Sequence, residues 1–416
     1  MEKIVTEGWP KWPVITEEDV EAAAEVMRRG EMSLAGGGGE LQKLEEEFAE
    51  YQGRKFCLSV NGGTAALDTG VALSGAGPGD EVLVSPYTWG ATVGCILHNN
   101  AIPVFVDIDP KTFTMEPKKI EEKITERTKA IMVVHIYGIP ADMDPIMEIA
   151  KRHKLMVIED SAQATGAKYK GRLVGSLGHI GCFSLQASKN LACGEGGAIV
   201  LDDEELYEEA LLYASHPARH GRAVSERMAR YVDSLGWNFR MFPPAAAVAR
   251  VQLKHLDERN EIKRKNIERL FEGIRGLPGI GLPELPDYLE PSYHMIPLTY
   301  KDEDLGGVER EEFISQMREA GVRIGHYVTR PIYLRPRHQE YLFYTRGCPW
   351  TCPYADRLVE YKKGDCPVTE EICEKRELTL SASPLAQPCD KLIDQIIAAF
   401  KAVCGRFAKR AKVSSR

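Results

Sequence analysis

The sequence predicts an α/β protein in which helices cover both faces of a mostly parallel β-sheet, followed by a smaller C-terminal α/β domain. Over the first half of the chain, short apolar runs alternate with segments of helical periodicity, and most of the runs are apolar on both faces. This alternation ends at about Asp202. With 416 residues, 44% of them hydrophobic, the chain is long enough for two or three structural units.

Seven apolar runs are the predicted strands of the large sheet. They lie at 56–60, 81–85, 103–107, 130–135, 156–159, 182–184 and 198–201. Helical patterns between them predict helices at 41–51, 64–73, 88–99, 117–124 and 145–153. A strand that is followed by a helix and then by another strand is typical of parallel pairing, so we expect a mostly parallel seven-stranded sheet.

The second half of the chain has a different pattern. It predicts a helix at 206–214, a long helix at 243–275 broken near Asn260, proline-rich turns at 277–291, a strand at 293–300, and helices at 310–320 and from 389 to 401 or a little beyond. We therefore expect a large domain at 1–255, including an N-terminal segment, and a small domain at 256–416. Residues 36–39, four glycines, predict a flexible loop.

Composition excludes several classes of function. The net charge of -8 argues against nucleic acid as the main partner, because binding to a phosphate backbone needs a basic face. The N-terminus has no apolar signal region, and no run approaches the ~18 apolar residues of a membrane span. The sequence predicts a cytoplasmic protein without a membrane partner.

Four of the ten cysteines lie close together in the sequence. Cys348, Cys352, Cys366 and Cys373 have the spacing C-x3-C-x13-C-x6-C, whereas zinc sites usually contain the tighter C-x2-C. Metal binding, a disulfide and free thiols all stay open, with free thiols as the default, and we predict no metal site.

The first segment that carries chemistry is 60–73, VNGGTAALDTGVAL. A strand ends in Asn-Gly-Gly-Thr and a helix begins at once. Glycine lets backbone N–H groups approach an anion, and the helix N-terminus adds partial positive charge. The segment is therefore a candidate phosphate cradle, although Gly63-Thr64 before a helix is also an ordinary capping sequence.

The second segment is 155–167, LMVIEDSAQATGA, where a buried strand ends in Glu159-Asp160. Ligands bind at the carboxyl ends of strands in open α/β sheets, and a buried carboxylate needs a partner. A protonated pyridine nitrogen would be such a partner. The alternative is an aspartate that caps a helix.

The third segment is 182–200, CFSLQASKNLACGEGGAIV, in which Lys189 lies between a strand and a glycine-rich run. A lysine amine that is desolvated loses its proton more easily, and this favours imine chemistry. Ser184 and Ser188 are polar neighbours that can reach a phosphate. The alternative is a surface lysine beside a loop.

Together, the three segments resemble the fold-type I, aspartate aminotransferase-like enzymes that depend on pyridoxal 5'-phosphate (PLP). More narrowly, the chain resembles the DegT/DnrJ/StrS family of sugar and cyclitol aminotransferases from about Trp12 to the last helix. The motifs that carry the resemblance are NGGTAAL, GDEVLVSPYTWGATV, IPVFVDID, IEDSAQATGA, FSLQASKNLACGEGGAIV and LGWNFRM.

The resemblance implies a role for each matching residue. Lys189 would hold the cofactor as a Schiff base and act as the catalytic residue, and Asp160 would bind the pyridine nitrogen. Gln163 would lie beside the ring, and Trp89 would stack on it. The phosphate would contact Gly63, Thr64, the backbone N–H of Ala65, and Ser184. Asn238, in GWNFRM, matches an asparagine that reaches the phosphate of the neighbouring subunit, which implies a homodimer with shared active sites.

The resemblance also implies the substrates: glutamate or glutamine as amino donor, and a keto sugar, usually nucleotide-linked, or a ketocyclitol as acceptor. The segments WPKWPVIT and PYTWGATV are closer to the cyclitol and aminohydroxybenzoate branch. Arg219 and Tyr327 are the preferred candidates for substrate contacts. Further candidates are His216, His220, His326, Arg330, Tyr333 and residues 36–39.

Three departures from the family pattern concern the site. Thr165 stands where the family commonly has histidine, Gly62 is an additional glycine before the Gly-Thr pair, and Pro243-Pro244 begins the helix after GWNFRM. Three alternatives to transamination also follow from the resemblance: a reaction like that of aminohydroxybenzoate synthase, a PLP dehydratase, and a non-catalytic regulatory homologue. A dehydratase of this family would carry histidine in place of Lys189, so the lysine argues against it.

Overall fold

The computed structural model describes residues 3–216, 219, 225–231 and 236–414. Its centre is a seven-stranded sheet with the order β1-β9-β8-β5-β4-β2-β3. The strands are β1 (Phe56–Val60), β2 (Glu81–Val84), β3 (Ile102–Phe105), β4 (Thr128–Val134), β5 (Met156–Asp160), β8 (Ile180–Ser184) and β9 (Gly197–Leu201). Only β9 runs against the others, so the mostly parallel sheet is confirmed.

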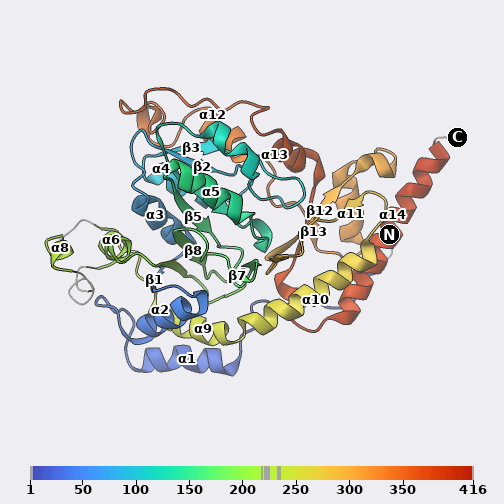
Figure 1. The fold of residues 1–416 in the computed structure, drawn as a ribbon. Helices are drawn as coiled ribbons and strands as arrows, with labels where there is room; N and C mark the ends of the chain where they lie inside the picture. Colours follow the sequence, from blue (N-terminus) through green and yellow to red (C-terminus); the bar gives the residue numbers. More distant parts are fainter. Residues whose placement is uncertain (1–2, 217–218, 220–224, 232–235, 415–416) are drawn as a thin grey trace.

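Side chains along each buried strand alternate between the two faces of the sheet, so both faces must be covered, and helices cover both. Ile131 and Val133 of β4 pack in the cluster that contains α5 (Met143–His153). Met132, between them, packs in the cluster that contains α3 (Gly63–Leu73), α4 (Gly90–His98) and α6 (Glu204–Ala214). Figure 1 shows α5 lying across the sheet and α3 at its edge.

A second unit forms around a four-stranded antiparallel sheet of order β10-β12-β14-β13. Its strands are β10 (Ile280–Gly281), β12 (Met295–Tyr300), β13 (Ile324–Gly325) and β14 (Glu377–Ser381). It shares one hydrophobic core with α10 (Leu256–Ile274), α11 (Arg310–Glu319) and α14 (Asp390–Ser414). Figure 1 shows α10, the long yellow helix, leading from beneath the large sheet to this unit.

Two segments pack away from the domain in which the sequence places them. Ile4 and Val5 donate backbone hydrogen bonds to the carbonyl of Ala320, so the N-terminal strap lies on the C-terminal unit. Conversely, 332–366, which includes α12 (Pro336–Gln339), packs Tyr333 and Trp350 against the large sheet. A three-stranded sheet, β11-β6-β7, also joins Leu289–Glu290 to Lys168–Tyr169 and Arg172–Leu173. The boundary at 255/256 stays a prediction.

Four sequence-based assignments are wrong in detail. A helix at Glu17–Arg28, α1, was not predicted. The predicted helix at 117–124 is two 3-10 turns, Pro117–Lys119 and Glu121–Lys123, because only Ile120 supplies a buried anchor there. The break in the long helix falls at His255, between α9 (Pro243–Lys254) and α10. The glycine loop is shorter than expected, since Gly39 already begins α2 (Gly39–Gln52).

No helix in the described ranges has the length and apolar character needed to cross a membrane.

Candidate active site

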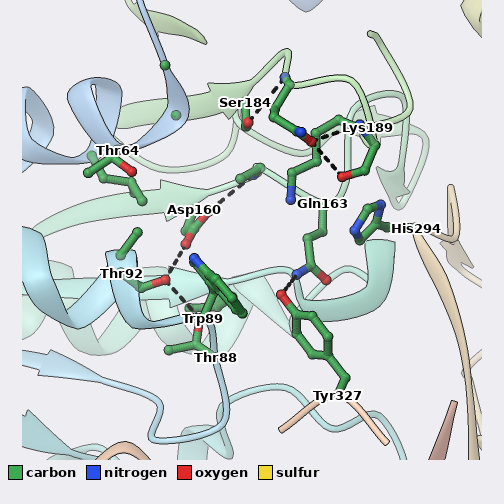
Figure 2. Close-up of a pocket in the computed structure, with 18 of the residues that line it drawn as sticks. Thr64, Thr88, Trp89, Thr92, Asp160, Gln163, Ser184, Lys189, His294 and Tyr327 are labelled. Atoms are coloured by element: carbon green, nitrogen blue, oxygen red, sulfur yellow. Dashed lines mark hydrogen bonds between the residues drawn. The ribbon is translucent and has the colours of Figure 1, made fainter. Parts of the chain in front are cut away.

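A cavity of about 450 Å³ opens where three neighbouring strands of the large sheet end. Val134, Asp160 and Ser184 are the last residues of β4, β5 and β8, and all three line it. The cavity collects eight of the predicted site residues: Gly63, Thr64, Trp89, Asp160, Gln163, Ser184, Lys189 and Tyr327. Figure 2 shows the side chains of all of these except Gly63 around one common space. The structure therefore brings together segments that lie far apart in the sequence.

One wall of the cavity is the N-terminus of α3. Gly62 is the residue before the helix, and no side chain caps the first N–H groups, which lack partners within the helix. A Cβ on Gly63 would lie 2.6 Å from Cβ of Ser184, so only glycine fits this close approach of α3 to β8. Ala65 is buried in the core with its N–H in the same first turn. This wall has the geometry and partial positive charge of a phosphate cradle.

Asp160 lies on the opposite side, almost fully buried. Its Oδ2 accepts a hydrogen bond of 2.8 Å from Oγ1 of Thr92, and its Oδ1 accepts one of 3.1 Å from the N–H of Ala162. Burial raises the pKa of Asp160, and these hydrogen bonds oppose the shift. None of the described basic residues forms an ion pair with it, so the site would favour a cationic ligand.

Glu159, the neighbouring carboxylate, points to the other face of the sheet and is completely satisfied. It accepts hydrogen bonds from the N–H groups of Gly175 and Leu177, each 2.7 Å long, and lies 2.9 Å from Nε2 of His135. Nδ1 of His135 accepts from the N–H of Ala141, which places the histidine proton on Nε2. Burial opposes ionisation, but His135 and the backbone donors together lower the pKa of Glu159. Glu159 is therefore structural, and Asp160 is the strand-end carboxylate that lines the cavity.

Lys189 lies in the turn after β8, and this turn is closed by hydrogen bonds from Lys189 N–H to the carbonyl of Gln186 and from Ala187 N–H to that of Gly194. Burial lowers the pKa of Lys189, while the charge of Asp160 opposes the shift. No described carboxylate forms an ion pair with the amine. A neutral amine is the nucleophilic form of lysine, so this environment suits attack on a carbonyl carbon.

The mouth of the cavity is formed by two aromatic rings. Trp89 is 61% exposed, and its ring stacks on that of Tyr327 at 6.0 Å between centroids and 26° between planes. The Tyr327 hydroxyl accepts a hydrogen bond of 2.9 Å from Nε2 of Gln163. An exposed tryptophan at a cavity mouth offers a flat apolar surface for a planar ligand.

Gln163 and Tyr327 are fixed from behind by Glu377, which sequence analysis did not identify. Its carboxylate accepts hydrogen bonds from the hydroxyl of Tyr137 (2.6 Å) and from the N–H groups of Tyr327 (2.7 Å) and Val328 (3.0 Å). The Tyr137 N–H in turn donates to Oε1 of Gln163 at 2.7 Å. These bonds close a ring that joins β14 of the small sheet to the cavity wall.

His294 is a second cavity residue that sequence analysis missed. Burial, together with the positive charges of Lys189 and Lys263, holds its pKa well below the usual value, so the imidazole is neutral. Its buried Nδ1 has no hydrogen-bond partner. His294 lies just before β12 in the small sheet, and no local motif marks it as a site residue.

Other predicted residues lie outside the cavity. Arg219 forms an ion pair with Glu45 in a separate hollow beside Gly36, Gly37 and Gly38. Asn238 is exposed, between Trp237 and Phe239, whose N–H groups are bonded to the carbonyls of Tyr213 and Ala214. Their contacts with substrate or a partner subunit stay predictions.

The remaining substrate candidates are also placed elsewhere. His326 lies 3.1 Å from a carboxylate oxygen of Glu311, and buried Tyr333 donates to Glu370. His216 and Arg330 are exposed, and His220 lies outside the described residues. The hydroxyl of Thr165, which replaces the family histidine, is buried without a hydrogen-bond partner.

None of the ten cysteines forms a disulfide, so the disulfide expected as one alternative for Cys348, Cys352, Cys366 and Cys373 is not formed. Within the described residues, one group has metal-ligand geometry: Asp68, Cys95 and His98. Asp68 there already accepts a hydrogen bond of 2.9 Å from the Tyr213 hydroxyl, and Cys95 donates to the carbonyl of Thr64.

A glycine-led helix N-terminus, a buried aspartate and an unpaired lysine at the carboxyl edge of one parallel sheet are what a fold-type I PLP enzyme requires, and they define the class of this protein. The profile of the DegT/DnrJ/EryC1/StrS aminotransferase family matches residues 13–401. The chain belongs to this PLP-dependent aminotransferase family.

Relatives of known activity agree with this assignment. The L-glutamine:2-deoxy-scyllo-inosose aminotransferase of Micromonospora echinospora is 37% identical over 321 residues, 74% of this chain and 76% of that protein. The L-glutamine:scyllo-inosose aminotransferase of Streptomyces griseus is 32% identical over 409 residues, 95% of this chain and 94% of that protein. The crystal structure of S. venezuelae DesV in complex with a ketimine intermediate superposes with a TM-score of 0.79 at 31% identity, covering 95% of this chain and 99% of DesV.

Proposed function

We propose that this protein binds PLP and transfers the amino group of glutamine or glutamate to the ketone of a keto sugar or ketocyclitol. The observation that carries the proposal is the position of Lys189 and Asp160 in one cavity with the uncapped end of α3. Lysine, aspartate and phosphate cradle are the three contacts that this cofactor needs.

The residues present fit the cofactor. Its phosphate would be held by the first turn of α3 at Gly63 and Thr64 and by Ser184, its ring nitrogen by Asp160, and its ring face by Trp89. Bound PLP supplies an electron sink that stabilises negative charge on the carbon next to the substrate nitrogen. Asp160 supports this sink, because an ionised carboxylate keeps the ring nitrogen protonated.

Lys189 would move the proton between substrate carbon and cofactor carbon. Its amine must be neutral to accept the proton, and burial lowers its pKa in this direction. Gln163, locked by Tyr137 and Tyr327, would keep the ring from turning within the plane. Trp89 would exclude water from one ring face. Lysine at position 189 also disfavours the dehydratase alternative, and the intact set of Lys189, Asp160 and Ser184 disfavours a non-catalytic regulatory role.

The donor and acceptor classes are supported by relatives. Two proteins that match this chain are L-glutamine:inosose aminotransferases, which use glutamine with a ketocyclitol. A third, 36% identical over 319 residues, is a dTDP-3-amino-3,4,6-trideoxy-alpha-D-glucose transaminase, named for a nucleotide-linked sugar. Sequence identity does not separate the two acceptor types, so both belong to the proposal.

We infer further that the active unit is a homodimer. Asn238 is exposed, and so are two large apolar side chains near it in the chain. Trp237 is 58% exposed and Phe242 is 47% exposed. Apolar side chains of this size are usually covered at interfaces. A dimer in which Asn238 enters the partner's phosphate site would cover them.

The proposal is tested by adding PLP to the purified protein and recording its visible absorbance. We expect a band of lysine-bound cofactor that glutamine or glutamate bleaches and that a ketocyclitol or keto sugar restores. A screen of donors and acceptors read at this band would identify both substrates. Absence of the band at saturating PLP would refute the proposal.

Gly63→Ala is expected to weaken PLP binding by at least tenfold. The added methyl would lie 2.6 Å from Cβ of Ser184, so α3 or β8 must shift, at a cost of roughly 1–3 kcal/mol. The measurement is a spectroscopic titration with PLP. Gly62→Ala is the matched control, because its Cβ meets no atom within 4 Å. Equal affinities of the two variants would contradict a tight phosphate cradle at Gly63.

A further inference from the structure

Arg335 places a positive charge at the rim of the cavity. It directly precedes α12, and its Nη1 lies 3.7 Å from the position that a Cβ on Gly90 would occupy. Trp89 and Ala91, on either side of Gly90, both line the cavity. Burial raises the pKa of Tyr327 to about 12, and the charge of Arg335 opposes this shift. The guanidinium therefore lies beside Gly90 and within electrostatic reach of Tyr327.

The backbone that carries Arg335 is firmly held. The N–H of Ile332 donates to the carbonyl of Pro86 at 3.2 Å, in the loop that leads into Trp89. Nε2 of Gln339 donates to the carbonyl of Tyr333 at 2.7 Å, and the N–H of Arg335 donates to the carbonyl of Ile332 at 3.0 Å. The backbone that carries Arg335 is thus held against the loop that precedes α4.

The side chain of Arg335 has no partner among the described residues: no ion pair or hydrogen bond reaches its guanidinium. Two other partly buried arginines show the contrast, since both are paired with carboxylates. Arg250, 24% exposed, binds Glu40 and Glu47, and Arg376, 23% exposed, binds Glu303 and Glu371. A half-buried cation without a carboxylate is ready to bind an anion from outside.

The proposed reaction needs such a cation. Every amino-acid donor carries an α-carboxylate next to the reacting carbon. Among the described residues that line the cavity, the basic ones are Lys189 and His294. Lys189 is occupied by the chemistry, and His294 is neutral. The inososes named for the glutamine-dependent relatives carry no charge, so the donor carboxylate is the anion that this reaction always brings.

We propose that Arg335 binds the α-carboxylate of the amino donor across the gap that Gly90 leaves open. This role rests on the proposed function. In it, Arg335 recognises the donor as an amino acid by its α-carboxylate. Its planar guanidinium can hold both carboxylate oxygens, which lysine cannot do. Because Gly90 has no side chain, its position leaves the guanidinium uncovered on the side that faces α4.

The test compares two donors in the first half-reaction, followed at the cofactor band. One is glutamine, and the other is 4-aminobutanamide, which is glutamine without its α-carboxylate. For Arg335→Gln we expect kcat/KM for glutamine to fall by about 10²-fold, the size of a lost charge-assisted interaction, with little change for 4-aminobutanamide. Arg335→Lys should recover only part of the loss. 2-Methylglutamine has no α-proton and cannot be turned over, so titration with it measures binding alone. Its affinity for Arg335→Gln should fall by the same factor.

Arg337→Gln is the matched control, because Arg337 is exposed two residues further along α12 and is expected to leave both donors unchanged. Gly90→Leu should act like Arg335→Gln, since its side chain would cover the guanidinium. Equal losses for the two donors, or a loss confined to the acceptor half-reaction, would overturn the assignment while leaving the proposed function intact. No cofactor band in the unmodified protein would overturn both.

Discussion

Lys189→Ala is expected to abolish the visible band of bound PLP and to lower transamination by about 10⁴-fold, the upper range for a positioned acid–base group. The variant loses both the covalent attachment of the cofactor and the amine that moves the proton. Lys189 has no ion pair in the described structure, so its removal breaks no electrostatic contact on which the fold depends. We therefore expect a thermal unfolding temperature close to that of the unmodified protein. Absorbance, turnover and thermal unfolding are the three measurements.

Lys391→Ala, in the exposed first turn of α14, controls for the loss of a lysine in general. It should keep the band and the activity. A Lys189→Ala variant that kept full activity would show that another amine performs the chemistry. Lys263 is the most informative second variant in that case, because it is fully buried and burial lowers its pKa to about 7.

Asp160→Asn is expected to lower turnover by at least about 10²-fold, as the loss of a preorganised electrostatic contact usually does. Asparagine cannot keep the ring nitrogen protonated, so the electron sink weakens. The variant should still bind PLP and show the band, because Lys189 and the phosphate cradle are unchanged. Turnover and PLP affinity, measured side by side, separate the two effects.

The same variant has a second expected result that depends on pH. Burial raises the pKa of Asp160 in the folded chain without cofactor. The contribution of Asp160 to the free energy of unfolding is therefore full below the unfolded pKa of about 3.9 and is lost as pH rises through the folded value. Asp160→Asn should therefore leave the cofactor-free protein at least as stable at pH 7.

Glu159→Gln provides the contrast. The pKa of Glu159 is lowered, so its stabilising effect is present above the unfolded pKa of about 4.3 and is lost as pH falls through the folded value. This variant should unfold more easily at neutral pH, because the buried charge receives hydrogen bonds from His135 and the backbone. If both variants changed stability in the same direction, the opposite environments of these neighbouring carboxylates would be refuted.

Much of the large domain was predictable because its signals are local. Each strand is a short, mostly apolar and mostly buried run, and each is found within a few residues of its predicted place. The cradle, Asp160 and Lys189 all lie at strand ends, where chain order and parallel pairing determine that they meet. The break in the long helix is predicted near Asn260 but lies at His255, because the polar pattern around Asn260 gives no sign of where the helix must turn towards the small sheet.

The sequence by itself determined the sheet, the order of its chemistry-bearing segments and the family, because these depend on patterns within a few residues. Only the tertiary structure decided which distant side chains complete the cavity. Tyr327, His294, Glu377 and Arg335 all come from the C-terminal half, and their effect depends on how the small unit packs against the large sheet. Burial and partners, rather than residue type, distinguish Arg335, whose guanidinium has no partner in the described part of the chain, from Arg219, which is neutralised by Glu45.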